Sequence, residues 1–310
     1  FEYSPYELAL ASKMVGVVEH ENLDLLHVHY AIPHASAAYM AKQILKTKGI
    51  YIPVVTTLHG TDITLVGKDA SFEPVVTFSI NQSDMVTAVS EDLKKSTYKL
   101  FNIHKDIDVI PNFIDLTKFS KQKKDHFKKA ICPAGEKLIV HISNFRKVKK
   151  IDDVIKIFNL IQKQLPSKLL MIGDGPERPF AESICRDCVT THQIKFLGKQ
   201  EQMEDILPLA DLFLLTSEYE SFGLAALEAM AAEVPVISTN AGGLPEINID
   251  GYSGFMSNVG DVDDMCKHAL EILKDKPTHD RFKANALAQA KKFDISNIVP
   301  KYEKLYEGLL

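Results

Sequence analysis

The sequence predicts an α/β protein made of two doubly wound, Rossmann-like domains, each built on a parallel sheet. Two observations predict this fold. Short apolar segments rich in β-branched residues alternate with segments of helical periodicity along the whole chain. After a polar, lysine-rich stretch at 116–136, the same alternation starts again. We therefore expect an N-terminal domain at 1–115, a C-terminal domain at 116–293, and a last helix at 294–310 that packs back towards the N-terminal domain.

The N-terminal part begins with helical periodicity and then shows four strand-like segments. The segment "HASAAYMAKQILKTKG" has helical spacing and ends at a glycine, which is a common helix stop. The strands are apolar runs without strict alternation, which is typical of strands that are buried on both faces. The predicted strands are 23–29, 52–60, 84–90 and 106–115, and the predicted helices are 1–20, 34–49 and 91–101.

The C-terminal part repeats this pattern and adds more helices at its end. The segments "KLIVHIS", "KLLMIGDG" and "DLFLLTS" are each apolar and each run into a polar or glycine-containing loop. The predicted strands are 137–143, 168–175, 193–198, 211–217, 234–239 and 252–259, and the predicted helices include 151–164, 177–187, 201–210 and 244–248.

Composition and charge exclude several classes of protein. The 310 residues are 45% hydrophobic and 25% charged, with a net charge of −5, which argues against a nucleic-acid-binding protein. The run "ILPLADLFLLTS" is broken by Pro208 and Asp211, so we expect no stable membrane insertion. Without a recognisable leader at Phe1, we expect a cytoplasmic protein. The sequence leaves homo-oligomer formation open.

The stretch "SEYESFGLAALEAMAAEVPV" at 217–236 places two acids around a predicted helix start. Ser221 is a suitable N-cap, and the amides of the first turn would then lack acceptors within the helix. Such a helix start binds anions, and Gly223 allows a phosphate to approach the backbone. Glu220 would lie just before the cap and Glu228 about two turns further. A core helix with two surface acids is the alternative.

Three more loops follow predicted strands of the C-terminal domain. "SNFRKVKK" offers Asn144, Arg146 and Lys149, which suit a diphosphate but also a simple solvated surface. The glycines of "GDGPE" (Gly173) and "TNAGGLPE" are each weak signals, because a tight turn explains either of them. In doubly wound folds ligands bind at the carboxyl ends of strands, so four such loops together predict a nucleotide-diphosphate domain.

Histidines mark the N-terminal domain instead. His27 and His29 alternate onto one strand face, and His34 and His59 are close in sequence to the ends of strands. A metal cluster is one interpretation. However, no H-E-x-x-H pattern or carboxylate-rich companion accompanies these residues, so we expect no metal site and interpret His59, in "TTLHGTD", as a polar ligand contact.

Taken in order, "VIPNFID", "SNFRKVKK", "GDGPE", "ESFGLAALEAMA" and "TNAGGLPE" resemble the retaining GT-B glycosyltransferases of family 4. The resemblance covers nearly the whole chain, and its most specific part is the pair of glutamates separated by seven residues, Glu220 and Glu228. It implies two domains facing a cleft and a metal-independent hexosyltransferase that retains the anomeric configuration.

Further segments, "HVHYAIPHASAAYMAKQ", "TTLHGTDIT" and "HISNFRKVKK", are similar to members of this family that begin bacillithiol synthesis. That resemblance implies UDP-N-acetylglucosamine as the donor substrate, the small hydroxy acid L-malate as the acceptor, and no cofactor. The alternatives are another acceptor, such as a sugar or a lipid, a UDP-N-acetylglucosamine epimerase of similar architecture, or a non-enzymatic two-domain sugar-binding protein. The two glutamates argue against the epimerase.

The resemblance also implies a role for individual residues. Glu220 is expected to bind hydroxyls of the donor sugar, Glu228 to bind the ribose, and Arg146 and Lys149 to stabilise the leaving UDP, while His59 faces the reacting sugar. The catalytic residues implied are His59, Arg146, Lys149 and Glu220. The donor-binding residues implied are Asn144, Gly173, Ser221, Phe222, Gly223, Leu224 and Glu228. The acceptor-binding residues implied are Tyr30, Thr57 and Asn112.

The sequence departs from the family pattern at two places. Family members open with a strand and a glycine-rich loop, which have no counterpart before Phe1, so we expect the chain to be part of a longer protein. Glu233 stands where the family has a glycine after the helix. A left-handed backbone there would destabilise the fold by about 1 kcal/mol.

Overall fold

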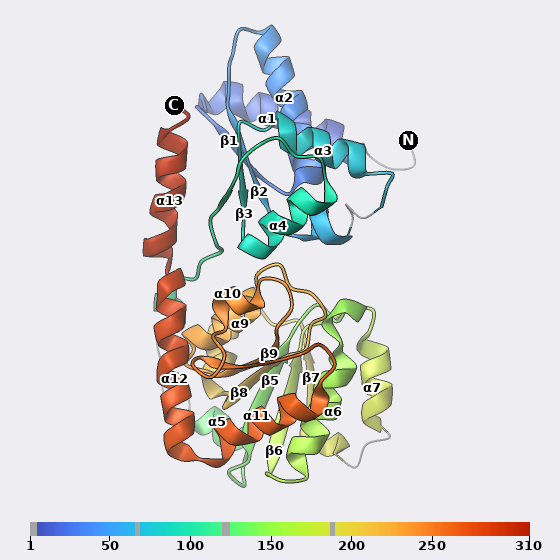
Figure 1. Cartoon of the computed structure of the whole chain (residues 1–310), viewed down its shortest axis with the longest axis vertical. Coiled ribbons are helices and arrows are strands. Elements are labelled where there is room, and N and C mark those ends of the chain that lie inside the picture. The colour runs from blue at the N-terminus through green and yellow to red at the C-terminus, as the bar shows by residue number, and fades with distance from the viewer. Residues whose placement is uncertain (1–4, 66–68, 120–124, 187–189) are drawn as a thin grey trace. The chain divides into compact units, whose positions relative to one another are not determined.

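The computed structural model describes residues 5–65, 69–119, 125–186 and 190–310 (Figure 1). The chain forms two compact units. Unit 1 consists of Phe1–Asn112 together with Ser296–Leu310, and unit 2 consists of Phe113–Ile295. Unit 1 is therefore assembled from two separate stretches of the sequence. Residues 120–124, in the predicted lysine-rich stretch, lie outside the described residues.

Unit 1 contains a four-stranded parallel sheet in which the strands follow their order in the sequence. The pairing places His29 opposite Thr57, at the carboxyl ends of the first two strands. Side chains of a strand alternate between faces, so His27 and His29 share one face, and their rings are 4.7 Å apart. The strands are β1 (Leu26–His29), β2 (Val54–Leu58), β3 (Met85–Ala88) and β4 (Ile107–Val109).

Five helices accompany this sheet within the described residues. They are α1 (Tyr6–Glu21), α2 (Ser36–Thr47), α3 (Glu73–Gln82), α4 (Glu91–Leu100) and α13 (Ile295–Glu307). Helix α3 was not predicted from the sequence, although Val76, Ser79 and Ile80 on its inner face are buried. Helix α13 is joined to the sheet by a hydrogen bond of 2.6 Å between the Tyr306 hydroxyl and His27 Nδ1.

Unit 2 contains a six-stranded parallel sheet with the order β10-β9-β8-β5-β6-β7. The order changes direction between β5 and β8, which makes this the topological switch point of the sheet. The main-chain pairing between β5 and β8 includes only Ile139 with Leu212 and Val140 with Phe213. The strands are β5 (Lys137–Ile142), β6 (Ser167–Ile172), β7 (Ile194–Gly198), β8 (Leu212–Leu215), β9 (Val236–Thr239) and β10 (Gly254–Ser257).

The core of unit 2 lies between this sheet and helices such as α6 and α11, which contribute Ile157, Phe158, Ala269 and Leu273. The two helices pack against each other, and Figure 1 shows them beside the sheet. The helices of unit 2 are α5 (Asp125–Ile131), α6 (Ile151–Gln162), α7 (Arg178–Arg186), α8 (Met203–Ile206), α9 (Leu224–Ala231), α10 (Leu244–Ile247), α11 (Val262–Lys274) and α12 (Lys276–Ala290).

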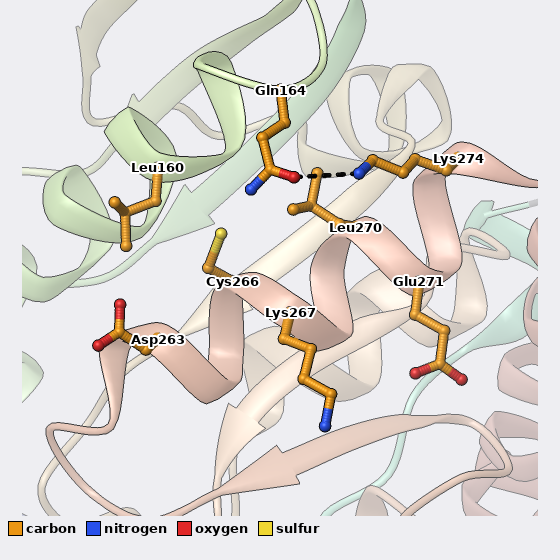
Figure 2. Close-up of a pocket in the computed structure, with 8 residues that line it drawn as sticks. All are labelled: Leu160, Gln164, Asp263, Cys266, Lys267, Leu270, Glu271 and Lys274. Atoms are coloured by element: carbon orange, nitrogen blue, oxygen red, sulfur yellow. Dashed lines mark hydrogen bonds between the residues drawn. The ribbon is translucent and has the colours of Figure 1, made fainter.

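A surface groove of about 500 Å³ lies where the end of α6 meets α11 (Figure 2). Lys274 donates a hydrogen bond of 3.1 Å to Gln164 across it. None of the predicted site residues lines this groove, so we assign it no part in substrate binding or catalysis. In the described part of the chain, none of the helices has the length and apolar character required to cross a membrane.

Candidate active site

Four loops that the sequence analysis singled out follow β5, β6, β8 and β9, which are neighbours in the sheet of unit 2. Since all these strands are parallel, the loops emerge at the same edge of the sheet. The predicted donor-side residues are therefore gathered at one edge, on both sides of the topological switch point.

The loop after β8 leads into α9 through a glycine. Helix α9 begins at Leu224, and Gly223 is its N-cap residue with φ of 97°. The prediction that Ser221 caps this helix is therefore wrong. This φ strains any residue with a side chain, and an added Cβ would also lie 2.6 Å from the Leu244 side chain, so the turn favours glycine.

The start of α9 presents backbone amides that helix geometry leaves without an acceptor inside the helix. The amides of Ala226 and Leu227 donate to the Gly223 carbonyl, at 2.9 and 3.1 Å, so the unpaired positions are those of Gly223, Leu224 and Ala225. These amides and the helix dipole favour an anion such as a diphosphate. Phe222 has a different role, because its buried ring packs against other side chains of unit 2.

Glu220 is fixed by contacts through both its carboxylate and its carbonyl. Lys149 Nζ lies 2.5 Å from Glu220 Oε1, and the Ser217 hydroxyl donates to the same oxygen at 2.8 Å. The Glu220 carbonyl accepts from the Gly243 amide at 2.8 Å. A Cβ on Gly242 would lie 2.0 Å from that carbonyl, so the paired glycines allow the loop after β9 to approach Glu220.

The loop that carries Lys149 is attached to the loop that carries Glu220. The Thr216 hydroxyl is 2.9 Å from the carbonyls of both Lys149 and Lys150, and the Glu218 amide donates to the Val148 carbonyl at 2.7 Å. The Lys149 side chain is only 18% exposed. Arg146, by contrast, is exposed at the start of the same loop. Of the two cations, Lys149 is therefore the one whose position is fixed by contacts.

Gly173 supports the basic loop through close packing. Its φ is 117°, and a Cβ there would lie 1.8 Å from the Ser143 carbonyl. Gly175 approaches the carbonyl of Asn144 in the same way, at 2.0 Å. The Gly173 loop therefore has a structural reason for its glycines that does not involve a ligand, whereas the Asn144 side chain is exposed.

Glu228 lies in α9 among largely buried residues. Burial is the main cause that raises its pKa from 4.5 to about 7, and the negative charge of Glu204 raises it further. A carboxylate that is partly desolvated and near a second acid is typical of a functional site, because ionised oxygens then form strong hydrogen bonds to a ligand.

In unit 1, the predicted residues meet at the ends of β1 and β2. His29 Nδ1 and His59 Nε2 are 2.8 Å apart, and the Tyr30 ring is 5.1 Å from the His59 ring. Thr57 is fully buried, with its hydroxyl bonded to His27 Nε2 at 2.7 Å and to Thr87 at 2.6 Å. Thr57 therefore orients His27 and does not offer its side chain to an acceptor.

His27 and His59 are neutral at physiological pH. Burial, with the charge of neighbouring histidines, lowers the pKa of His27 and of His59 to about 4. Among the described residues, no group of three or more His, Cys, Asp or Glu side chains is arranged to hold a metal ion. A neutral His59 remains able to donate or accept one hydrogen bond with a sugar hydroxyl.

Asn112 and Glu233 are the two remaining residues that the sequence singled out. Asn112 is partly buried in the segment after β4, at the end of the first stretch of unit 1. Glu233 has φ of 59°, so the left-handed conformation expected after α9 is present.

Sequence reasoning missed several residues that organise these loops. Thr216 and Ser217 directly follow β8 and hold the neighbouring loop and Glu220, as described above. Asp62 is buried and accepts hydrogen bonds from the amides of Ala31, at 2.6 Å, and Gly60, at 3.1 Å, so it shapes the loops around His59. A polar residue inside or directly after an apolar strand is the signal that could have found them.

Comparisons with known proteins place the chain among glycosyltransferases. The family described as "Glycosyl transferases group 1" matches residues 122–289, and the one described as "Glycosyltransferase Family 4" matches residues 1–118. The N-acetyl-alpha-D-glucosaminyl L-malate synthase of Bacillus anthracis is 45% identical over 312 residues, which cover 100% of this chain and 81% of that protein.

Solved structures share the fold at low identity. The Anabaena protein HepE in complex with UDP-glucose has a TM-score of 0.81 at 21% identity, covering 96% of this chain and 82% of that chain. Sucrose-phosphate synthase from Thermosynechococcus elongatus has a TM-score of 0.79 at 20% identity, covering 99% and 80%. The two-sheet GT-B architecture expected from the sequence is confirmed.

Proposed function

Because the chain belongs to the group 1, family 4 glycosyltransferases, we propose that it transfers N-acetylglucosamine from UDP-N-acetylglucosamine to the hydroxyl of L-malate. The anomeric configuration would be retained. By the resemblance stated above, the product would be the first intermediate of bacillithiol synthesis.

One observation carries this proposal. The similarity to the Bacillus anthracis N-acetyl-alpha-D-glucosaminyl L-malate synthase, at 45% identity, spans the whole chain and thus the sequence of both units. By comparison, the putative teichuronic acid biosynthesis glycosyltransferase TuaC of Bacillus subtilis is 28% identical over 77% of this chain and 59% of that protein.

The geometry of unit 2 supports a donor site for a nucleotide sugar. The diphosphate would lie against the amides at the start of α9, and the Glu228 carboxylate would accept hydrogen bonds from the ribose. As the glycosidic bond breaks, negative charge grows on the departing UDP, and Lys149 with Arg146 would stabilise that charge. Glu220, held by Lys149 and Ser217, would accept from hydroxyls of the donor sugar.

The acceptor side is proposed to involve unit 1. The neutral His59, oriented by His29, would bind the reacting sugar, while Tyr30 and Asn112 would supply hydrogen-bond donors to the acceptor. L-malate is a dianion, and neutral donors can orient one carboxylate. The second carboxylate would then require a cation.

The decisive experiment measures UDP release from UDP-N-acetylglucosamine with and without L-malate. A panel of D-malate, succinate and a neutral sugar serves as the comparison. We expect release to depend on L-malate, a product mass equal to N-acetylglucosaminyl malate, and an α-anomeric coupling by NMR. Transfer to the neutral sugar with no response to malate would reject the acceptor, and an inverted anomer would reject the retaining reaction.

A further inference from the structure

A buried histidine lies at the topological switch point of unit 2 and is not among the donor-site or acceptor-site residues. His141 is the fifth residue of β5, and its side chain is fully buried among apolar neighbours. Both ring nitrogens have partners. Nδ1 lies 2.9 Å from the Leu214 carbonyl on β8, and Nε2 lies 2.8 Å from the Ser143 hydroxyl at the start of the basic loop.

These partners determine which nitrogen carries the proton. A carbonyl oxygen only accepts, so Nδ1 must donate to Leu214. Burial, with a further effect of the Lys149 charge, lowers the pKa of His141 to about 4, so the ring is neutral and has a single N–H. Nε2 must then accept from the Ser143 hydroxyl. The Ser143 oxygen in turn faces the Phe145 amide at 3.4 Å. The hydrogen bonds therefore run in one direction from the loop to β8.

His141 lies where the main-chain pairing between β5 and β8 ends. Pairing between β5 and β8 ends at Val140 with Phe213, and beyond this point the two strands lead into different loops. One loop carries Lys149 and the other carries Glu220. The His141 side chain bridges the strands one residue further along and so replaces a backbone hydrogen bond at the place where the loops diverge.

The basic loop depends on such support because its backbone is strained. Phe145 is fully buried with φ of 37°, an unfavourable conformation for a residue with a side chain. On the side of β6, Gly173 and Gly175 pack against the loop and the Glu177 amide donates to the Phe145 carbonyl at 2.9 Å. On the side of β8, His141 and Ser143 add a second side-chain link to the one made by the Thr216 hydroxyl.

We propose that His141 is a positioning residue for glycosyl transfer, which holds the loop of Lys149 at its working distance from the loop of Glu220 through the directed Ser143–His141–Leu214 chain. The proposal rests on the glycosyltransferase activity and not on the identity of the acceptor. A displacement of about 1 Å in a catalytic group is enough to lower turnover roughly a hundredfold.

Two substitutions separate the two hydrogen bonds. The amide of asparagine occupies the place of Nδ1, so His141→Asn keeps the bond to Leu214 and loses Ser143. The amide of glutamine occupies the place of Nε2, so His141→Gln keeps Ser143 and loses Leu214. We expect each variant to lower turnover about 10- to 100-fold, while the dissociation constant of UDP changes less than about threefold, because the start of α9 and Glu228 are not part of the displaced loop.

A double-mutant cycle tests whether the residues act as one chain. If they do, His141→Asn combined with Ser143→Ala should be no slower than the slower single variant. If the turnover of the double variant falls by the product of the two single effects, the proposal is wrong. In ¹⁵N NMR spectra of the unmodified protein, the His141 ring should show a protonated Nδ1 and an unprotonated Nε2, and the reverse tautomer would equally overturn it.

His279 provides a matched control. It is also a buried histidine of unit 2 that donates to a carbonyl, from Nε2 to Asp211 at 2.8 Å, but it lies on α12. His279→Asn, whose amide cannot take the place of Nε2, should lower the melting temperature and leave turnover per folded molecule unchanged. If both histidine variants lose turnover only in proportion to stability, His141 is merely structural. Failure of the malate assignment would remove turnover from the parent protein as well, so the two failures are distinguishable.

Discussion

Replacing Glu228 by glutamine should stabilise unit 2 and at the same time weaken nucleotide binding. In the folded protein burial, and to a smaller extent Glu204, raise the pKa of this carboxyl from 4.5 to about 7. Ionisation is therefore harder in the folded than in the unfolded chain. The free energy of unfolding then falls as pH rises from 4.5 to 7, and above pH 7 the full destabilisation is present.

The magnitude follows from the size of the pKa change. Each pKa unit corresponds to 1.36 kcal/mol, so the ionised Glu228 destabilises the unliganded protein by about 3 kcal/mol at pH 8 and by less than about 1 kcal/mol at pH 5. Glutamine has nearly the same shape and no charge. Glu228→Gln should thus raise the melting temperature by several degrees at pH 8, roughly 2–4 °C per kcal/mol, with little change at pH 5.

Binding should change in the opposite direction. A carboxylate forms stronger hydrogen bonds to ribose hydroxyls than a neutral amide, and the loss of about 1–3 kcal/mol corresponds to roughly 5- to 150-fold weaker UDP binding at pH 8. At pH 6 the parent carboxyl is mostly protonated, so the difference should shrink. In the parent, UDP affinity should fall as the pH is lowered through 7.

The assay combines calorimetric titration of UDP with thermal unfolding, both at three pH values. Glu204→Gln is the control, because it removes the repulsion but keeps the Glu228 carboxyl. This control should strengthen UDP binding near pH 6.5 and give only part of the stabilisation at pH 8. Equal UDP affinity of Glu228→Gln and the parent at pH 8, or a stabilisation independent of pH, would refute the reasoning.

Four other outcomes are expected. Lys149→Ala and Arg146→Ala should each lower turnover about a hundredfold with smaller effects on substrate binding, whereas Lys147→Ala in the same loop should not; unchanged kinetics would leave the first two as surface cations. Glu233→Gly should raise the free energy of unfolding by about 1 kcal/mol in denaturant titrations, because it relieves the left-handed backbone, and a loss of stability would contradict this. Thr57→Val should lower stability by about 1–3 kcal/mol because it removes the partner of His27 Nε2, with UDP affinity retained; a variant of parental stability would argue against that network. EDTA should leave transfer unaffected, and activity restored by manganese would point to a required metal.

The strands and the loops of unit 2 could be predicted because the sequence signal is local. Apolar runs of β-branched residues mark buried parallel strands, and in this fold the loop after each strand lies at the ligand edge whatever its own conformation. Glu220, Lys149 and Gly242 were therefore placed at one edge without knowledge of their contacts. The pairing of Lys149 with Glu220, by contrast, joins residues that are 71 positions apart, and their order in the sequence does not indicate it.

The wrong predictions also have physical causes that the local sequence does not show. Ser221 has good capping chemistry, but the left-handed backbone of Gly223, with φ of 97°, places the start of the helix two residues later. The sequence indicates Thr57 as a residue that could bind an acceptor, but its hydroxyl bonds to His27 on β1 and to Thr87 on β3. Only the register of the sheet reveals these contacts. His141 was hidden in an apolar strand, because a buried histidine with two satisfied nitrogens has no recognisable sequence pattern.

The split composition of unit 1 has a consequence during synthesis. Its last described strand, β4, has been synthesised once Asn112 has left the ribosome, but Tyr306, which closes the hydrogen bond to His27, belongs to the second stretch of unit 1. At typical elongation rates of about 5–20 residues per second, translation of the intervening unit 2 takes roughly 10–40 s. Throughout that interval the nascent sheet exposes the surface reserved for the C-terminal helix, while unit 2, a continuous segment, can fold as soon as it emerges. Chaperones that protect exposed apolar surface are therefore most needed by the first part of the chain, and a premature stop before residue 296 would leave a folded nucleotide unit attached to an unfinished partner.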